Sequence, residues 1–99
     1  MTRLPARHTQ SARFLSTLAH PLRLQILDLL RGGEMCVCDL QAALKQRQAC
    51  VSQHLMALRE AGVVTCRKAG LRVYYQIGDE RLPELLDKIE AVVLPGERR

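Results

Sequence analysis

The sequence predicts a small α+β domain that is mostly helical, with about five helices and a two-stranded β-hairpin. Apolar residues recur at intervals of three and four over most of the chain, which is the spacing of amphipathic helices. Residues 71–77 instead alternate apolar and polar side chains, as a half-buried strand does. The length of 99 residues fits one domain. We expect this domain to span 10–94, between a flexible basic arm, 1–9, and a frayed tail, 95–99.

The first half of the domain predicts two consecutive helices. The first covers 10–18, and His20-Pro21 ends it because a residue before proline avoids the helical region. Pro21 then suits the first turn of a second helix over 21–31, which Gly32-Gly33 terminates.

The central stretch predicts two short amphipathic helices, 38–44 and 48–61, joined by a polar turn at 45–47. Their inward stripe consists of Leu40, Leu44, Val51, Leu55 and Leu58. The outward face of the second helix carries hydrogen-bonding side chains of the kind that contact base edges and phosphates. This is the pattern of a helix-turn-helix whose second helix enters a major groove.

Two strands, 63–68 and 71–77, are predicted next, with Ala69-Gly70 as the turn between them. The residues expected on their buried face are Leu71, Val73, Tyr75 and Ile77. Cations flank the hairpin tip, as in a wing that lies along a phosphate backbone. The combination predicts a winged helix-turn-helix, and the candidate DNA contacts are Gln46, Arg47, Gln48, Ser52, Gln53, His54, Arg59, Arg67, Lys68 and Arg72.

A final helix is predicted after Asp79, which suits its N-cap, with Pro83 in its first turn. Its apolar residues fall on one face: Leu82, Leu85, Leu86, Ile89 and Val93. We expect this face to pair with a second subunit and form a homodimer, since chains this short bury only roughly 60–65% of their unfolded surface. The alternative is that the helix packs back on its own core.

The charge is unevenly distributed. The formal net charge is +5 and the pI about 9.4, and the stretch 41–76 holds six cations and one acid, so it carries the whole excess. A solvated basic face is the simplest explanation of such a cluster. Its coincidence with the helix-turn-helix and hairpin favours double-stranded DNA as the partner.

Four cysteines are present, and they do not form the pattern of a secreted disulfide framework. The chain has no charged-then-apolar leader and no apolar run near the roughly 20 residues of a membrane span. We therefore expect a cytoplasmic protein with reduced thiols and no membrane partner. Cys36 and Cys38 are also too close in sequence for an easy mutual disulfide.

Four blocks of the sequence resemble, in order and spacing, the ArsR/SmtB family of metal-responsive repressors: LSTLAHPLRLQILDLL, EMCVCDL, VSQHLMALREAGVV and RKAGLRVYYQI. The resemblance covers about residues 12–77. It implies a homodimeric winged helix-turn-helix that represses its own operon and leaves the operator when metal binds. It also implies that 48–59 is the recognition helix and 67–72 the wing.

The Cys-x-Cys pair, Cys36 and Cys38, is the candidate sensor, because thiolates are soft ligands that select thiophilic ions. As(III) and Sb(III) prefer three sulfurs, whereas cadmium, lead and zinc usually take four ligands. The arsenic-sensing members that this segment resembles carry a third Cys, in a pattern like ELCVCDLC, where this chain has Gln41. The third sulfur is then expected from Cys50, Cys66, a partner chain or a small thiol.

The spacing of the pair suggests a mechanism. Residues i and i+2 of a regular helix point about 200° apart, so both sulfurs can hold one ion only where the backbone is not helical. We hypothesise that binding reshapes the first turn of the supporting helix and tilts the recognition helix away from its DNA register. By linkage, DNA must weaken metal binding by the same factor.

These observations predict a DNA-binding repressor released by As(III) or Sb(III), with no organic cofactor. The alternative is a repressor of the same fold that responds to cadmium, lead, zinc or thiol oxidation. The cysteines could also have no sensing role and serve only as small residues of the core. A thiol redox enzyme or a metal carrier would also use such a pair. The first would need a βαβ pattern around it, and the second has no use for a basic wing. No phosphate-binding glycine loop, nucleophile–base set or catalytic metal motif is present, so we expect no enzyme activity.

Overall fold

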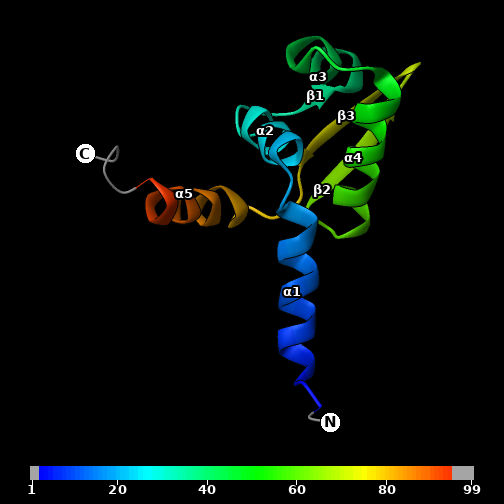
Figure 1. The fold of residues 1–99 in the computed structure, drawn as a ribbon. Helices are drawn as coiled ribbons and strands as arrows, with labels where there is room; N and C mark the ends of the chain where they lie inside the picture. The colour runs from blue at the N-terminus through cyan, green and yellow to red at the C-terminus, as the bar shows by residue number, and fades with distance from the viewer. Residues whose placement is uncertain (1–2, 95–99) are drawn as a thin grey trace.

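The computed structural model describes residues 3–94, which form five α-helices and a three-stranded antiparallel sheet (Figure 1). The elements follow in the order α1 (Ala6–Leu18), α2 (Pro21–Leu30), β1 (Met35–Cys36), α3 (Val37–Leu44), α4 (Gln48–Glu60), β2 (Val64–Ala69), β3 (Arg72–Ile77) and α5 (Leu82–Val93). The mostly helical α+β class and the winged helix-turn-helix are confirmed. No helix within 3–94 has the length and apolarity needed to cross a bilayer.

The sheet contains one strand more than the sequence predicts. Strand β1 pairs with β3 in the register Met35↔Tyr75 and Cys36↔Tyr74, and β3 pairs with β2 on its other side. Two residues are too few to show a period-2 pattern, so β1 is invisible in the sequence. Its position matters because it attaches the start of α3 to the hairpin.

The helix-turn-helix core is built as the apolar spacing predicts. Val51, Leu55 and Leu58 of α4 are fully buried, as are Ile26 and Leu27 of α2. Helices α3 and α4 both pack on α2, and α4 also contacts β2. The inward stripe therefore fixes the face that α4 turns to solvent.

The turn between α3 and α4 is tight. Lys45 adopts a left-handed conformation, with φ 56°, and its N–H donates to the carbonyl of Gln41 at 2.9 Å. This single bond closes the end of α3 in the manner of a left-handed C-cap. Helix α4 can then start three residues later.

The hairpin turn lies one residue later than predicted. Ala69 pairs with Arg72, which leaves Gly70 and Leu71 as a two-residue turn, and Gly70 supplies the positive φ of 63° that such turns need. The expectation that Leu71 faces the core is therefore wrong, because its side chain is completely exposed at the tip. Val73, Tyr75 and Ile77 are partly or fully buried, as predicted.

The two terminal helices differ from prediction at their starts. Helix α1 begins at Ala6, so residues 6–9, expected in a flexible arm, are helical. Arg81 rather than Asp79 is the N-cap of α5. An Asp79 carboxylate oxygen instead accepts the Arg81 N–H at 2.9 Å, just before the helix begins. The predicted frayed tail, 95–99, lies outside the described residues.

Helices α1 and α5 extend away from the rest of the fold in different directions (Figure 1). Leu82 and Leu86 pack α5 onto its own core, as the alternative interpretation expects. Other apolar side chains of the two helices remain exposed: Leu15, Leu85, Val92 and Val93. These helices therefore leave apolar surface that the single chain does not cover.

Candidate DNA-contacting surface and thiol centre

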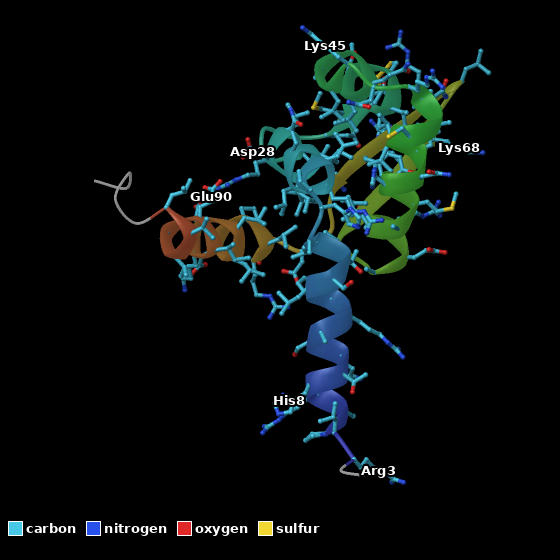
Figure 2. All side chains as sticks on the ribbon, viewed as in Figure 1. Arg3, His8, Asp28, Lys45, Lys68 and Glu90 are labelled. Atoms are coloured by element: carbon cyan, nitrogen blue, oxygen red, sulfur yellow. A yellow bond between two sulfur atoms is a disulfide. The ribbon has the colours of Figure 1, made fainter. Side chains whose placement is uncertain are left out.

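The outward face of α4 and the hairpin both carry exposed polar and basic side chains. Figure 2 shows Lys45 and Lys68 at the outer edge of this half of the molecule. The predicted DNA contacts that the structure leaves exposed are Gln46, Arg47, Gln48, Gln53, Arg59, Arg67, Lys68 and Arg72; Ser52 is partly exposed. This arrangement can present hydrogen-bond donors and acceptors to a groove while cations contact phosphates.

His54 faces a different neighbour from the one predicted. Its Nδ1 accepts a hydrogen bond from Arg23 Nε at 3.0 Å, its ring centroid lies 5.7 Å from that of His20, and the side chain is partly buried. Arg23 also donates to the carbonyl of Thr17 at 3.0 Å. The expectation that His54 faces DNA is not supported by this geometry, since the residue fastens α4 to the α1–α2 junction.

His54 should make stability depend on pH. Burial, with smaller contributions from the charges of Arg23 and His20, lowers the pKa of His54 below its usual 6.5. The folded state therefore binds fewer protons than the unfolded state, so this stability is complete above about pH 6.5 and is lost as the pH falls. Between pH 7.5 and 5.5, the free energy of unfolding measured in urea should fall less in His54→Gln than in wild type. His8→Gln, on the exposed part of α1, should keep the wild-type dependence, and an unchanged profile in His54→Gln would contradict this.

Arg67 is engaged within the chain. Its Nε and Nη2 each donate to a carboxylate oxygen of Glu34 at 2.7 Å, and its guanidinium lies 4.8 Å from the centroid of the Tyr74 ring. The hydrogen bond from Arg67 lowers the pKa of the Glu34 carboxyl. This bidentate pair crosses β3 and ties the segment before β1 to strand β2. Glu34 gave no sequence signal, because its partner lies 33 residues away.

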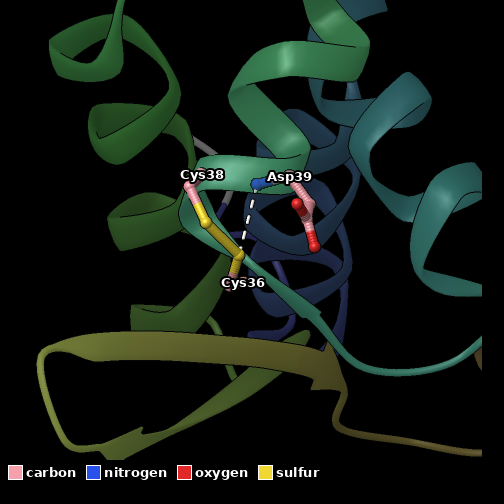
Figure 3. Close-up of side chains that lie close together, drawn as sticks. All are labelled: Cys36, Cys38 and Asp39. Atoms are coloured by element: carbon pink, nitrogen blue, oxygen red, sulfur yellow. Dashed lines mark hydrogen bonds between the residues drawn. A yellow bond between two sulfur atoms is a disulfide. The ribbon is translucent and has the colours of Figure 1, made fainter.

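The thiol pair lies at the start of α3. Cys36 is the N-cap, with an extended backbone at φ −76° and ψ 158°, and its sulfur accepts the Asp39 N–H at 3.3 Å. Cys38 lies in the first turn of α3, and the two Cα atoms are 5.4 Å apart. Because Cys36 is extended, both sulfurs reach the same side, as Figure 3 shows. The backbone at the pair is therefore not fully helical, which is the condition for both sulfurs to hold one ion.

The two sulfurs form a disulfide (Figure 3). The expectation that all four thiols are reduced, and that this pair is too close to bridge, is therefore wrong. The change from strand to helix between Cys36 and Cys38 turns their sulfurs toward each other.

Neither of the other cysteines approaches this pair. Cys66 lies on β2, two strands from β1, and neighbouring strands are about 4.8 Å apart, so the two backbones are separated by roughly 10 Å. Gln48 lies on the side of α4 that faces the pair, since Gln48 and both sulfurs line the same cavity. Cys50 is two residues further along α4, so its side chain points about 200° away from that side. Among the described residues, the side chain grouped with the two sulfurs is Asp39, whose carboxylate lies within 4.8 Å of both. Asp39 follows the pair directly in the sequence, and that adjacency is the signal that could have identified it.

A cavity of about 300 Å³ opens beside the disulfide. It lies between α3, α4 and the hairpin. The polar or reactive side chains that line it are Cys36, Cys38, Gln41, Gln48, Ser52, Arg72 and Tyr75. The cavity thus adjoins both the thiol pair and three of the predicted DNA contacts.

Comparison with known proteins agrees with this geometry. A model of bacterial regulatory proteins of the arsR family matches residues 20–65. The biofilm growth-associated repressor of Agrobacterium fabrum is 39% identical over 97 residues, which cover 95% of this chain and 83% of that protein. The arsenical resistance operon repressor of Staphylococcus xylosus is 34% identical over 85 residues, which cover 86% of this chain and 82% of that protein.

A solved structure has the same fold. The homodimeric winged helix-turn-helix DNA-binding domain from Mycobacterium bovis, described as a possible ArsR-family transcriptional regulator, superposes with a TM-score of 0.83 at 33% identity. The match covers 99% of this chain and 94% of that domain. Sequence and structure comparisons therefore agree along nearly the whole chain.

Proposed function

This chain belongs to the ArsR family of bacterial regulatory proteins, and we propose that it leaves its operator when As(III) or Sb(III) binds Cys36 and Cys38. As a member of this family it is a DNA-binding transcriptional repressor and not an enzyme. The arsenical resistance operon repressor among its relatives makes a metalloid inducer reasonable for this chain too.

The observation that carries the proposal is the convergence of two sulfurs at the joint between β1 and α3. Once the disulfide is reduced, two thiolates whose Cα atoms lie 5.4 Å apart supply soft ligands that can bind one thiophilic ion. Asp39 is the third candidate ligand, ahead of Cys50 and Cys66, because its carboxylate already lies within 4.8 Å of both sulfurs. A set of two sulfurs and one oxygen suits a three-coordinate trivalent ion better than an ion that needs four ligands.

The same joint offers a route to the DNA surface. Cys36 pairs with Tyr74 of β3, and Glu34 is bonded to Arg67 of β2, so the segment before α3 is attached to both strands of the hairpin. Helix α3 packs directly on α4. A new geometry at Cys36 and Cys38 would therefore move the hairpin and the recognition helix together. The metal-bound and DNA-bound states would then differ in their DNA contacts, as allosteric release requires.

Dimerisation would use α1 and α5. The apolar side chains left exposed on these helices, including Leu15 and Val92, are of the kind buried in homodimer interfaces. The related domain from Mycobacterium bovis is homodimeric. A second copy would also bring a second α4 to the DNA, as the repeated half-sites of operators require.

Direct binding of arsenite tests the inducer. Equilibrium dialysis of the reduced protein should give one arsenite per chain, and Cys38→Ser should lose this binding. Cys66→Ser is the matched control and should keep it. Loss in Cys66→Ser, or retention in Cys38→Ser, would contradict the proposed ligand set.

A second candidate function is favoured by the disulfide itself. Oxidation of Cys36 and Cys38 would fix the start of α3 in one geometry, and reduction would free it. If oxidation alone is the signal, operator affinity should differ between the oxidised and reduced protein without any metalloid. Equal affinities of the two forms would leave the metalloid as the inducer.

A further inference from the structure

We infer that the cavity beside Cys38 is a docking site for an anionic low-molecular-weight thiol, which exchanges with the Cys36–Cys38 disulfide. The inference rests on the proposed function in one respect, since it assigns regulation to the same thiol pair. It adds a ligand class and a chemical step. The ligand is a small molecule that carries both a thiol and a carboxylate.

The two sulfurs have unequal surroundings. Cys36 is 1% exposed, and its sulfur accepts the Asp39 N–H in the first turn of α3, whereas Cys38 is exposed. A thiolate from solvent can therefore reach Cys38. The backbone N–H of Asp39 is already placed to stabilise Cys36 as the departing thiolate, because it donates to that sulfur.

The exchange step follows from this asymmetry. The incoming thiolate forms a bond to the Cys38 sulfur, the Cys36–Cys38 bond breaks, and Cys36 leaves with the bonding electron pair as a thiolate. A second molecule of the same thiol attacks the small-molecule sulfur of the adduct and releases Cys38 as a thiolate. The products are the free dithiol and the disulfide of the small thiol, so electrons balance without another oxidant or reductant.

The cavity supplies the selectivity for an anion. Its volume of about 300 Å³ is at the lower end of ligand cavities, which range from about 300 to 1,000 Å³, and this size suits a small thiol. None of its lining side chains is acidic, and Arg72 forms no ion pair within residues 3–94. Gln41, Gln48 and Ser52 add hydrogen-bonding groups. Asp39 lies near the sulfurs but outside the lining, so it does not occupy the anion's position.

The adduct would also affect DNA contacts. Arg72 and Gln48 line the cavity and belong to the predicted DNA surface. A carboxylate held by Arg72 competes with a phosphate for the same cation. The small thiol thus converts the disulfide into the dithiol that a metalloid needs. While it is bound to Cys38, it also occupies part of the predicted DNA surface.

The test measures exchange on the oxidised full-length chain by intact-mass spectrometry after rapid acid quenching. The probes are N-acetylcysteine and its amide, which differ in the carboxylate. Each rate is divided by that thiol's rate with a small linear disulfide, which removes differences in intrinsic thiol reactivity. Peptide mapping locates the adduct.

We expect the normalised rate of N-acetylcysteine to exceed that of the amide by about threefold, the effect of one exposed ion pair. Arg72→Gln should abolish this preference. Lys68→Gln makes the same charge change on the same hairpin outside the cavity lining and should retain it. Equal normalised rates in wild type, an unchanged preference in Arg72→Gln, or an adduct on Cys36 would each overturn the inference.

This assay contains neither DNA nor metalloid, so its result is independent of the proposed inducer. Exchange with the expected preference, together with failure to bind arsenite, would reject the metalloid and leave the thiol site standing. Arsenite binding without the preference would do the reverse.

Discussion

Replacing Leu55 with alanine should lower the free energy of unfolding by about 2–5 kcal/mol, the usual cost of a Leu→Ala change in a core. The Leu55 side chain is fully buried at the middle of α4. Small domains are stable by only about 5–15 kcal/mol, so this one change removes a large part of the total. Urea unfolding of wild type and variant at one protein concentration measures the difference.

Met56→Ala is the matched control for this prediction. Met56 is the next residue of the same helix, but its side chain is 60% exposed. Its replacement should change stability by no more than about 0.5 kcal/mol. Similar losses in the two variants would mean that α4 does not bury the stripe of Leu55, and the assignment of its outward face would fail with it.

Replacing Gln53 with alanine should weaken operator binding by about 1–3 kcal/mol and relax sequence preference at one base pair. Gln53 is exposed on the outward face of α4, opposite the buried Leu55. A glutamine amide can both donate to and accept from the edge of an adenine in a major groove. Competition binding with operators mutated one base pair at a time measures both the affinity and the preference.

Lys68→Gln is expected to have a different signature. Lys68 is exposed on β2 near the hairpin tip, where a phosphate contact carries no sequence information. Its loss should weaken binding to all sequences alike and reduce the slope of log affinity against log salt by about 0.9. Base-specific loss in Lys68→Gln, or uniform loss in Gln53→Ala, would reverse the roles assigned to helix and wing.

Periodicity predicted the helical half of this fold well, because it depends on local spacing. The stripe of Val51, Leu55 and Leu58 is as buried as its spacing indicates. Gly62 follows the end of α4, with a positive φ of 77°, and the N–H of Val63 donates back to the Leu58 carbonyl. Such features follow from side-chain period and from the conformational freedom of glycine.

The features that the sequence could not reveal depend on contacts between distant segments. Strand β1 has only two residues and exists because β3 offers it a free edge. His54 has the same polar character as its neighbour Gln53, yet it meets Arg23, 31 residues earlier, and turns inward. The thiol pair was recognisable as a site, but its disulfide depends on the extended backbone of Cys36, which pairing with Tyr74 holds in place.

The most direct test of the account is release from DNA. Fluorescence anisotropy of labelled operator bound by the reduced protein would be titrated with arsenite, antimonite, cadmium and zinc, for wild type, Cys36→Ser/Cys38→Ser and the control Cys50→Ser. We predict that a trivalent ion lowers the operator affinity of wild type and Cys50→Ser by about 5- to 150-fold, the usual range of allosteric coupling, and leaves the double variant unaffected. Equal release of the double variant, or wild-type binding indifferent to both trivalent ions, would contradict a metalloid switch at Cys36 and Cys38.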